Sequence, residues 1–231
     1  LAIGTRLQDF TTGSWTVFGA DARLVALNVA RFDATKHLAH PLVADALEGL
    51  RELDELLQGW IADPAWTERA RQEAEDFKRF VAEATRPGPG GEPLSYAQVV
   101  GAVNRLAGEH DYALTASGGF PGELNANWLA KGVATFDCEY GFSCMGYEIA
   151  GAWGARMARP DGEVIAFLGD GSYLMLNSDL LSSVVSGHKL IVILCDNGGY
   201  AVIERLQVGQ GGASFNNMFS DVGPHAVEVD W

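Results

Sequence analysis

Two short segments combine residue types that can hold a divalent metal and a phosphate group. The first is Gly169-Asp170-Gly171-Ser172, in which a carboxylate stands between two glycines, and the second is Asp196-Asn197-Gly198-Gly199. Glycines allow close backbone approach to an anion, whereas the charge of Asp170 repels a phosphate unless a cation lies between them. A divalent metal resolves this conflict, because carboxylate and amide oxygens are ligands that Mg²⁺ accepts.

Each segment follows an apolar run that is typical of a buried strand. Residues 164–168 precede the first segment, residues 190–195 precede the second, and a helical pattern over 173–186 separates them. Such a crossover joins parallel strands, whose carboxyl ends share one edge of the sheet with the N-termini of helices that bind anions. We therefore predict a Mg²⁺ site made by the Asp170 carboxylate, the Asn197 amide oxygen and a backbone carbonyl of the following turn.

The same alternation of helices and strands fills the second half of the chain. The sequence predicts a helix over 96–107, a strand over 112–117 and a helix over 147–157 before the elements named above. Helices interleaved with apolar strands predict an α/β fold, with a parallel sheet covered by helices on both faces. Ahead of this region, short strands are expected in LAIGT and over 24–29, followed by an amphipathic helical pattern from Pro41 to about Thr85.

A linker separates these two regions. The segment ATRPGPGGEP, residues 84–93, breaks the periodicity with its prolines and glycines. We divide the chain into a first domain over 1–60, a helical and Pro/Gly-rich linker over 61–92, and the parallel-sheet domain over 93–231. Because the sequence opens on an apolar run without methionine, we expect it to be part of a longer polypeptide.

Composition excludes several classes of partner. The 231 residues are 48% hydrophobic and carry a formal net charge of -14, so the surface repels nucleic acid and anionic lipid headgroups. No apolar run is long enough to span a bilayer and no secretory signal opens the chain, which together predict a cytoplasmic location. Cys138, Cys144 and Cys195 lack C-x-x-C spacing and predict free thiols rather than disulfides or a zinc site.

With the Gly-Asp-Gly and Asn segments on adjacent strands, the chain resembles the thiamine diphosphate-dependent enzymes of the acetolactate synthase-like superfamily. The resemblance implies that Asp170, Asn197 and the carbonyl of Gly199 bind Mg²⁺. The usual Asn-Asn pair is Asp196-Asn197 here, and the departure falls on the position that is not a ligand. The implied cofactor-binding residues are Gly118, Gly119, Ser143, Met145, Gly169, Asp170, Gly171, Ser172, Asn197, Gly199 and Tyr200.

A second segment, EYGFSCMGYEIAGAWGAR over 139–156, is similar to the part of these enzymes that bends the cofactor. The resemblance implies that Met145 wedges between the two cofactor rings and that the carbonyl of Ser143 accepts a hydrogen bond from the aminopyrimidine. The bend brings the exocyclic nitrogen next to the thiazolium carbon that must lose its proton. Met145 is therefore the residue of this chain with the most direct expected role in catalysis, although a core methionine would also fit its place.

The resemblance covers almost the whole chain. Residues 1–60 resemble the end of a Rossmann-like central domain, and residues 93–231 most of the diphosphate-binding domain. Together with RLQVGQGGASFNN, residues 205–217, the segment 139–156 resembles a branch that hydrolyses a ring carbon–carbon bond of a cyclic dione in myo-inositol breakdown. The implied assembly is a homodimer or homotetramer with its active site at the subunit interface. The activating glutamate would lie in an amino-terminal domain outside this chain, so these residues alone are expected to be inactive.

Two other functions stay open at this stage. An acetolactate synthase-like protein would decarboxylate or ligate a 2-oxo acid with the same cofactor and the same metal site, because pocket changes move substrate preference easily in such folds. A non-catalytic chain would bind the cofactor and serve as a scaffold. Consumption of pyruvate would identify the former, and failure to turn over any substrate with the cofactor bound would identify the latter.

Overall fold

The computed structural model describes residues 1–225 and 229–231 and contains two compact units, residues 1–70 and 71–231. The boundary between the units falls inside the long helix α4 (Pro64–Ala84). The division of the chain at residues 60 and 92 rests on composition and stays a prediction.

The first unit is built on a three-stranded parallel sheet. Its strands are β1 (Ala2–Ile3), β2 (Val25–Leu27) and β3 (His40–Leu42), in the order β1-β2-β3. Its helices are α1 (Asp9–Thr12), α2 (Arg31–Ala34), a 3-10 turn (Lys36–Leu38) and α3 (Ala46–Leu56). The helical pattern predicted from Pro41 was wrong at its start, because Pro41 lies in β3 and α3 begins after Asp45, whose carboxylate caps it.

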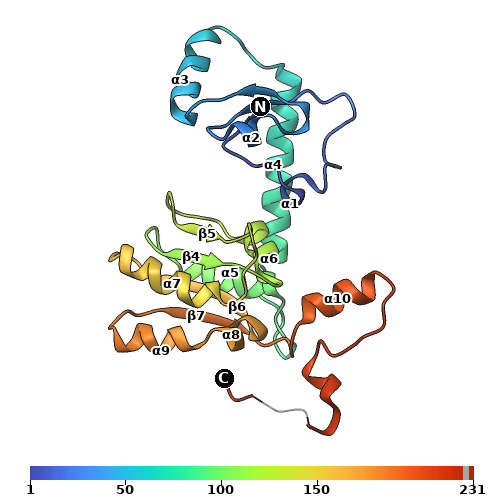
Figure 1. Cartoon of the computed structure of the whole chain (residues 1–231), viewed down its shortest axis with the longest axis vertical. Helices are drawn as coiled ribbons and strands as arrows, with labels where there is room; N and C mark the ends of the chain where they lie inside the picture. Colours follow the sequence, from blue (N-terminus) through green and yellow to red (C-terminus); the bar gives the residue numbers. More distant parts are fainter. Residues whose placement is uncertain (226–228) are drawn as a thin grey trace. The chain divides into compact units, whose positions relative to one another are not determined.

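The second unit contains a four-stranded parallel sheet (Figure 1). Its strands are β4 (Tyr112–Thr115), β5 (Phe136–Cys138), β6 (Val164–Gly169) and β7 (Ile191–Cys195), in the order β5-β4-β6-β7. All three pairings are parallel. Since β6 pairs with both β4 and β7, the two segments expected to bind the metal end on neighbouring strands, as the sequence predicts.

Helices cover both faces of this sheet. Ile165 and Phe167 of β6 pack with α5 (Tyr96–Leu106) and α6 (Phe120–Asn127) in one buried cluster. Val164 and Ala166 point to the other face and pack with α7 (Tyr147–Ala158). Alternate residues of one strand thus enter two apolar cores, which is why the strand is almost wholly apolar. The α/β fold class expected from the sequence is confirmed.

One predicted helix was wrong in an informative way. The expected helix over 173–186 is divided between two helices, α8 (Asp170–Met175) and α9 (Ser178–Val185). Leu176 between them has non-helical backbone angles, φ -150° and ψ 55°. Leu176 packs so closely on Gly146 that a Cβ atom built on this glycine would lie 2.6 Å from the Leu176 Cβ. Leu176 thus contacts a turn distant in sequence at the point where α8 ends, and such a contact is not visible in the periodicity.

The remaining elements follow β7 in the chain. They are α10 (Ala201–Gly209) and a 3-10 segment (Phe219–His225). Sequence analysis does not predict β5 or α6, although Pro121 in the first turn of α6 is a common helix-start signal. Among the described helices none is long and apolar enough to cross a membrane, and all three cysteines are free.

Candidate functional site

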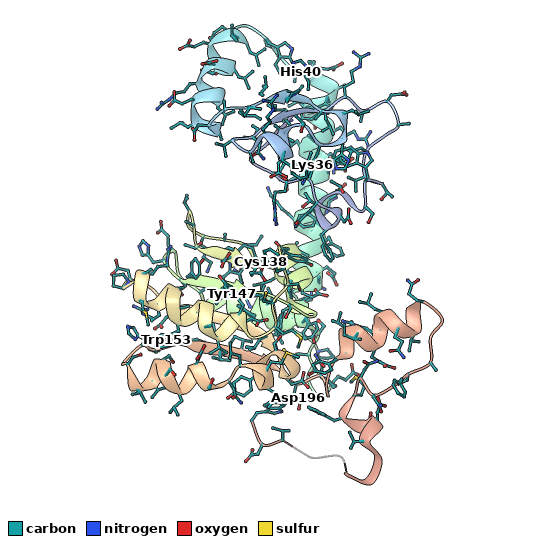
Figure 2. The ribbon with its side chains drawn as sticks, in the orientation of Figure 1. Lys36, His40, Cys138, Tyr147, Trp153 and Asp196 are labelled. Carbon is teal, nitrogen blue, oxygen red and sulfur yellow. The ribbon has the colours of Figure 1, made fainter. Side chains whose placement is uncertain are left out.

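The candidate site lies at the carboxyl edge of the four-stranded sheet. Gly169 at the end of β6 pairs with Cys195 at the end of β7, so the Gly-Asp-Gly and Asp-Asn-Gly-Gly segments leave the sheet side by side. Asp170 begins α8 and is fully buried. Figure 2 labels Asp196, which follows β7 at this edge. The fold therefore brings the two segments of sequence together at the place where parallel sheets bind ligands.

Three oxygen atoms face one another there. The side-chain oxygen of Asn197 lies 2.7 Å from the carbonyl oxygen of Gly199 and 3.3 Å from Oδ1 of Asp170, while its nitrogen lies 2.7 Å from the Tyr96 hydroxyl. All three oxygens are acceptors, with no proton between them. If the Asn197 amide is turned over, hydrogen bonds replace these contacts between acceptors. In the present orientation, a cation bound between the three oxygens would satisfy them.

The spacing of these oxygens suits a small divalent cation. Adjacent ligands of an octahedral Mg²⁺ lie about 2.9 Å apart, given metal–oxygen distances near 2.05 Å. Among the described residues there is no cluster of three or more His, Cys, Asp or Glu side chains that could hold a metal. One carboxylate and two neutral oxygens leave coordination positions for phosphate oxygens and water. The residues present thus fit a metal that is shared with a phosphorylated ligand.

Asp170 is held in place by the turn that follows β7. Its Oδ2 accepts a hydrogen bond from the Gly199 N–H at 2.6 Å. Burial raises the pKa of Asp170, and hydrogen bonds from the backbone of Gly171 and Gly199 oppose that rise. Gly199 has φ 134°, and a Cβ on it would lie 2.6 Å from the Asn217 carbonyl oxygen, so this turn requires glycine. A buried carboxylate without a cation is unfavourable, which agrees with a metal-binding role.

The Met145 side chain reaches the same site from another part of the chain. The Glu139 carboxylate holds its turn by accepting hydrogen bonds from the N–H groups of Phe142 and Cys144, each at 2.8 Å. The Cys144 hydrogen bond is the largest cause that lowers the pKa of Glu139. A Cβ on Gly171 would lie 3.4 Å from the Met145 Cε and 2.7 Å from the Tyr200 Cε1. Met145 and Tyr200 therefore flank the first glycine after Asp170.

A third segment, residues 117–119 after β4, completes the site. The hydroxyl of Ser117 lies 3.2 Å from that of Ser172, the third residue of α8. Gly118 has φ 84°, and a Cβ on Gly119 would lie 2.5 Å from the Tyr96 ring. Because Tyr96 also contacts Asn197, this loop and the metal-binding turn share one support.

The structure gathers most of the sequence-predicted site residues at one edge of the sheet. The side chains or backbone that meet at this edge are those of Gly118, Gly119, Met145, Gly169, Asp170, Gly171, Ser172, Asn197, Gly199 and Tyr200. Ser143 lies on an exposed turn with φ 54° and is placed two residues before Met145. Their roles in binding stay predictions.

Two residues of the site escaped the sequence analysis. Glu148 is fully buried in α7 and accepts hydrogen bonds from the N–H groups of Ser117 at 3.2 Å and Gly146 at 3.0 Å. Burial is the largest cause of the raised pKa of Glu148. A lone carboxylate inside the apolar stretch YEIAGAWGA was the available signal. Tyr96 gave no signal, because it meets Asn197 only through the tertiary fold.

Replacing Tyr96 by Phe tests the support of Asn197. Loss of the hydroxyl leaves the Asn197 amide without its partner, so we expect the dissociation constant of thiamine diphosphate at saturating Mg²⁺ to rise about 10-fold. Titration calorimetry on the full-length protein would measure it. Tyr112→Phe, at the start of β4, removes a hydroxyl far from this edge and serves as the control. Unchanged binding by the Tyr96 variant would remove Tyr96 from the site.

Comparison with known proteins agrees with this geometry. Residues 121–228 match the model of a family described as "Thiamine pyrophosphate enzyme, C-terminal TPP binding domain". This part of the chain is therefore similar to the cofactor-binding domain of thiamine pyrophosphate enzymes. The matched range of this domain contains Met145, Asp170, Asn197 and Gly199, whereas Tyr96 and residues 117–119 precede it.

Several curated proteins similar to this chain share one name. A 3D-(3,5/4)-trihydroxycyclohexane-1,2-dione hydrolase of Geobacillus thermodenitrificans is 38% identical over 95% of this chain and 37% of its own length. Two Bacillus cereus proteins, numbered hydrolase 1 and 2 under the same name, are 38% and 36% identical over 95% of this chain and 38% of theirs. The chain thus spans less than two fifths of the length of the relatives it matches.

Proposed function

We propose that the protein to which this chain belongs hydrolyses a ring carbon–carbon bond of trihydroxycyclohexane-1,2-dione, with thiamine diphosphate and Mg²⁺, and releases 5-deoxy-glucuronate in myo-inositol degradation. The names of the relatives support the substrate, and the matched domain supports the cofactor. The observation that carries the proposal is the convergence of Asp170, Asn197 and Gly199 oxygens beside Met145 at one edge of the sheet.

Each part of the chain has one task in this function. The Asp170, Asn197 and Gly199 oxygens hold Mg²⁺, which neutralises the diphosphate that would otherwise meet a buried carboxylate. Backbone N–H groups at the start of α8 face the same anion. Bound thiamine diphosphate supplies a nucleophilic carbon and an electron sink for cleavage of a bond next to a carbonyl.

Met145 and Ser143 orient the other end of the cofactor. The Met145 side chain, which lies beside Gly171, would support the two rings of the cofactor in a bent arrangement, and the Ser143 carbonyl would accept a hydrogen bond from the aminopyrimidine. Glu139 fixes the turn that carries both residues through its two backbone hydrogen bonds. Fixed positioning of this kind converts binding into a rate increase.

The proposal extends to the assembly. We propose a cytoplasmic homodimer or homotetramer in which the active site forms at the subunit interface. The glutamate that activates the pyrimidine ring would then come from an amino-terminal domain of the partner subunit. This chain spans 37% of the length of a relative, which leaves room for such a domain in the relatives.

One experiment separates the proposed activity from its alternatives. The full-length protein is incubated with thiamine diphosphate, Mg²⁺ and the trihydroxycyclohexanedione, and with pyruvate in a parallel tube, and products are followed by NMR. We expect the ring-opened acid from the dione and no consumption of pyruvate. The Asp170→Ala variant is the negative control for both tubes.

The other outcomes are equally specific. Consumption of pyruvate with release of carbon dioxide would keep the cofactor site and replace the hydrolase by a 2-oxo acid decarboxylase or ligase. Cofactor binding without turnover of either compound would favour the scaffold function. Failure to bind thiamine diphosphate in the presence of Mg²⁺ would contradict the site itself.

A further inference from the structure

The carboxylate of Glu148 is a point at which three of the segments of the candidate site meet. Its two oxygens accept hydrogen bonds from the N–H groups of Ser117, at 3.2 Å, and Gly146, at 3.0 Å. The Ser172 hydroxyl also acts on this carboxylate, since it opposes the rise of the Glu148 pKa that burial causes. These three groups belong to the loop after β4, the turn that carries Met145, and the first turn of α8.

The two serine hydroxyls extend this network. The Ser117 hydroxyl lies 3.2 Å from that of Ser172, and either oxygen can donate this hydrogen bond. The contact ties the start of α8 to the loop after β4, whose Ser117 N–H donates to Glu148.

The location of this carboxylate makes packing alone a poor explanation for it. Glu148 is 0% exposed and stands in the apolar run of α7, next to Ile149, which is also fully buried. Its donors are uncharged, so burial of its charge is offset by hydrogen bonds and not by an ion pair. An apolar residue would fill the same volume but would leave the hydrogen-bond donors of these segments without an acceptor.

We propose that Glu148 is a positioning residue, whose buried carboxylate holds residues 117–119, the turn over 143–146 and the start of α8 in the one arrangement that receives thiamine diphosphate. The proposal rests on the proposed function, because it concerns the same cofactor site. Glu148 acts through these segments, and no contact of its own with the cofactor is required.

Replacing Glu148 by Gln tests the proposal with the smallest change of shape. The amide keeps one acceptor but places an N–H group against the donors that the second oxygen served. We expect the dissociation constant of thiamine diphosphate at saturating Mg²⁺ to rise about 10-fold or more in the full-length protein, as for other supporting residues of metal sites. The kcat at saturating cofactor should fall much less, because the reacting groups are unchanged.

Asp111 provides a matched control at the other end of the sheet. Its carboxylate accepts hydrogen bonds from the N–H groups of Gly108, at 2.6 Å, and Glu163, at 2.8 Å, and so joins two loops as Glu148 does. Asp111→Asn should lower the unfolding temperature without cofactor to a similar extent as Glu148→Gln. Its cofactor dissociation constant should stay within about 2-fold of the wild-type value, as expected for a distant, independent site.

The outcomes separate this inference from the proposed function. Equal cofactor binding by Glu148→Gln and Asp111→Asn, with equal loss of unfolding temperature, would show a structural role only and overturn the positioning role. A wild-type protein that does not bind thiamine diphosphate would overturn the proposed function and the inference together. If Glu148→Gln does not fold, Glu148→Asp keeps the charge but withdraws the carboxylate from the N–H groups of Ser117 and Gly146, and wild-type cofactor binding by that variant would also contradict the proposal.

Discussion

The Asp170→Asn variant is expected to unfold at the same temperature as the wild type, or a higher one, when no metal is present, and yet to lose Mg²⁺-dependent binding of thiamine diphosphate. If the role of Asp170 were purely structural, the variant would unfold at a lower temperature than the wild type both with and without Mg²⁺ and cofactor. Thermal unfolding of the full-length protein, with and without Mg²⁺ and cofactor, measures both effects.

The geometry around Asp170 explains the first half of this expectation. Its Oδ1 lies 3.3 Å from the oxygen of Asn197, and its Oδ2 accepts the Gly199 N–H at 2.6 Å. An asparagine at this position can keep the bond from Gly199 through its amide oxygen. The Asn197 amide can turn over and donate to its neighbours in the metal-free wild type as well as in the variant. The expected gain, about 1 kcal/mol, therefore comes from removal of a buried charge.

The second half follows from the ligand set. Asp170 is the single charged group of the proposed ligand set, beside two neutral oxygens, so its loss should raise the dissociation constant of the Mg²⁺-cofactor pair on the order of 100-fold or more. The wild type should gain about 2.7 kcal/mol of stability at a ligand concentration 100 times that constant, and the variant should gain little.

Asp196→Asn is the matched control for this prediction. Asp196 is a carboxylate at the same sheet edge, but its oxygens accept hydrogen bonds from the Gly198 N–H and the Trp231 indole. It takes no part in the group of three oxygens, although, besides burial, its charge helps to raise the pKa of Asp170. The variant should therefore bind the cofactor within about 5-fold of the wild type, far from the loss expected for Asp170→Asn. Equal loss of binding in both variants would show that general charge near the site, and not ligation by Asp170, is what matters.

The Met145→Ala variant is expected to bind the cofactor with nearly wild-type affinity and to turn over substrate about 100-fold more slowly, a loss of about 2.7 kcal/mol in the barrier. Diphosphate and metal contacts, which supply affinity, are intact in this variant. The missing side chain instead frees the cofactor rings from the bent arrangement. Titration calorimetry and steady-state kinetics on the full-length protein separate the two quantities.

Met145→Leu is the control for shape. Leucine has a similar volume, and such exchanges are tolerated well in packed sites. We expect kcat within about 5-fold of the wild-type value, since the wedge is retained. A Met145→Ala variant with wild-type kcat would reduce Met145 to a packing residue beside Gly171.

The runs of apolar residues in the sequence were sufficient to predict three strands of the sheet. The apolar strands expected over 112–117, 164–168 and 190–195 are confirmed as β4, β6 and β7. They are visible in sequence because strands covered on both faces must be apolar at every position. Pattern failed for residues 173–186, where the packing of Leu176 on Gly146 divides one expected helix into two.

The sequence by itself determined the fold class and the residue types of the site. A carboxylate between glycines after one strand and an asparagine after the next predict a metal site wherever those strands are neighbours, and the parallel order β4-β6-β7 makes them so. Only the tertiary structure decided how Tyr96 and Glu148 take part. Both act through contacts between residues distant in the chain, Tyr96 with Asn197 and Glu148 with Ser117, and such contacts leave no periodicity or spacing in the sequence.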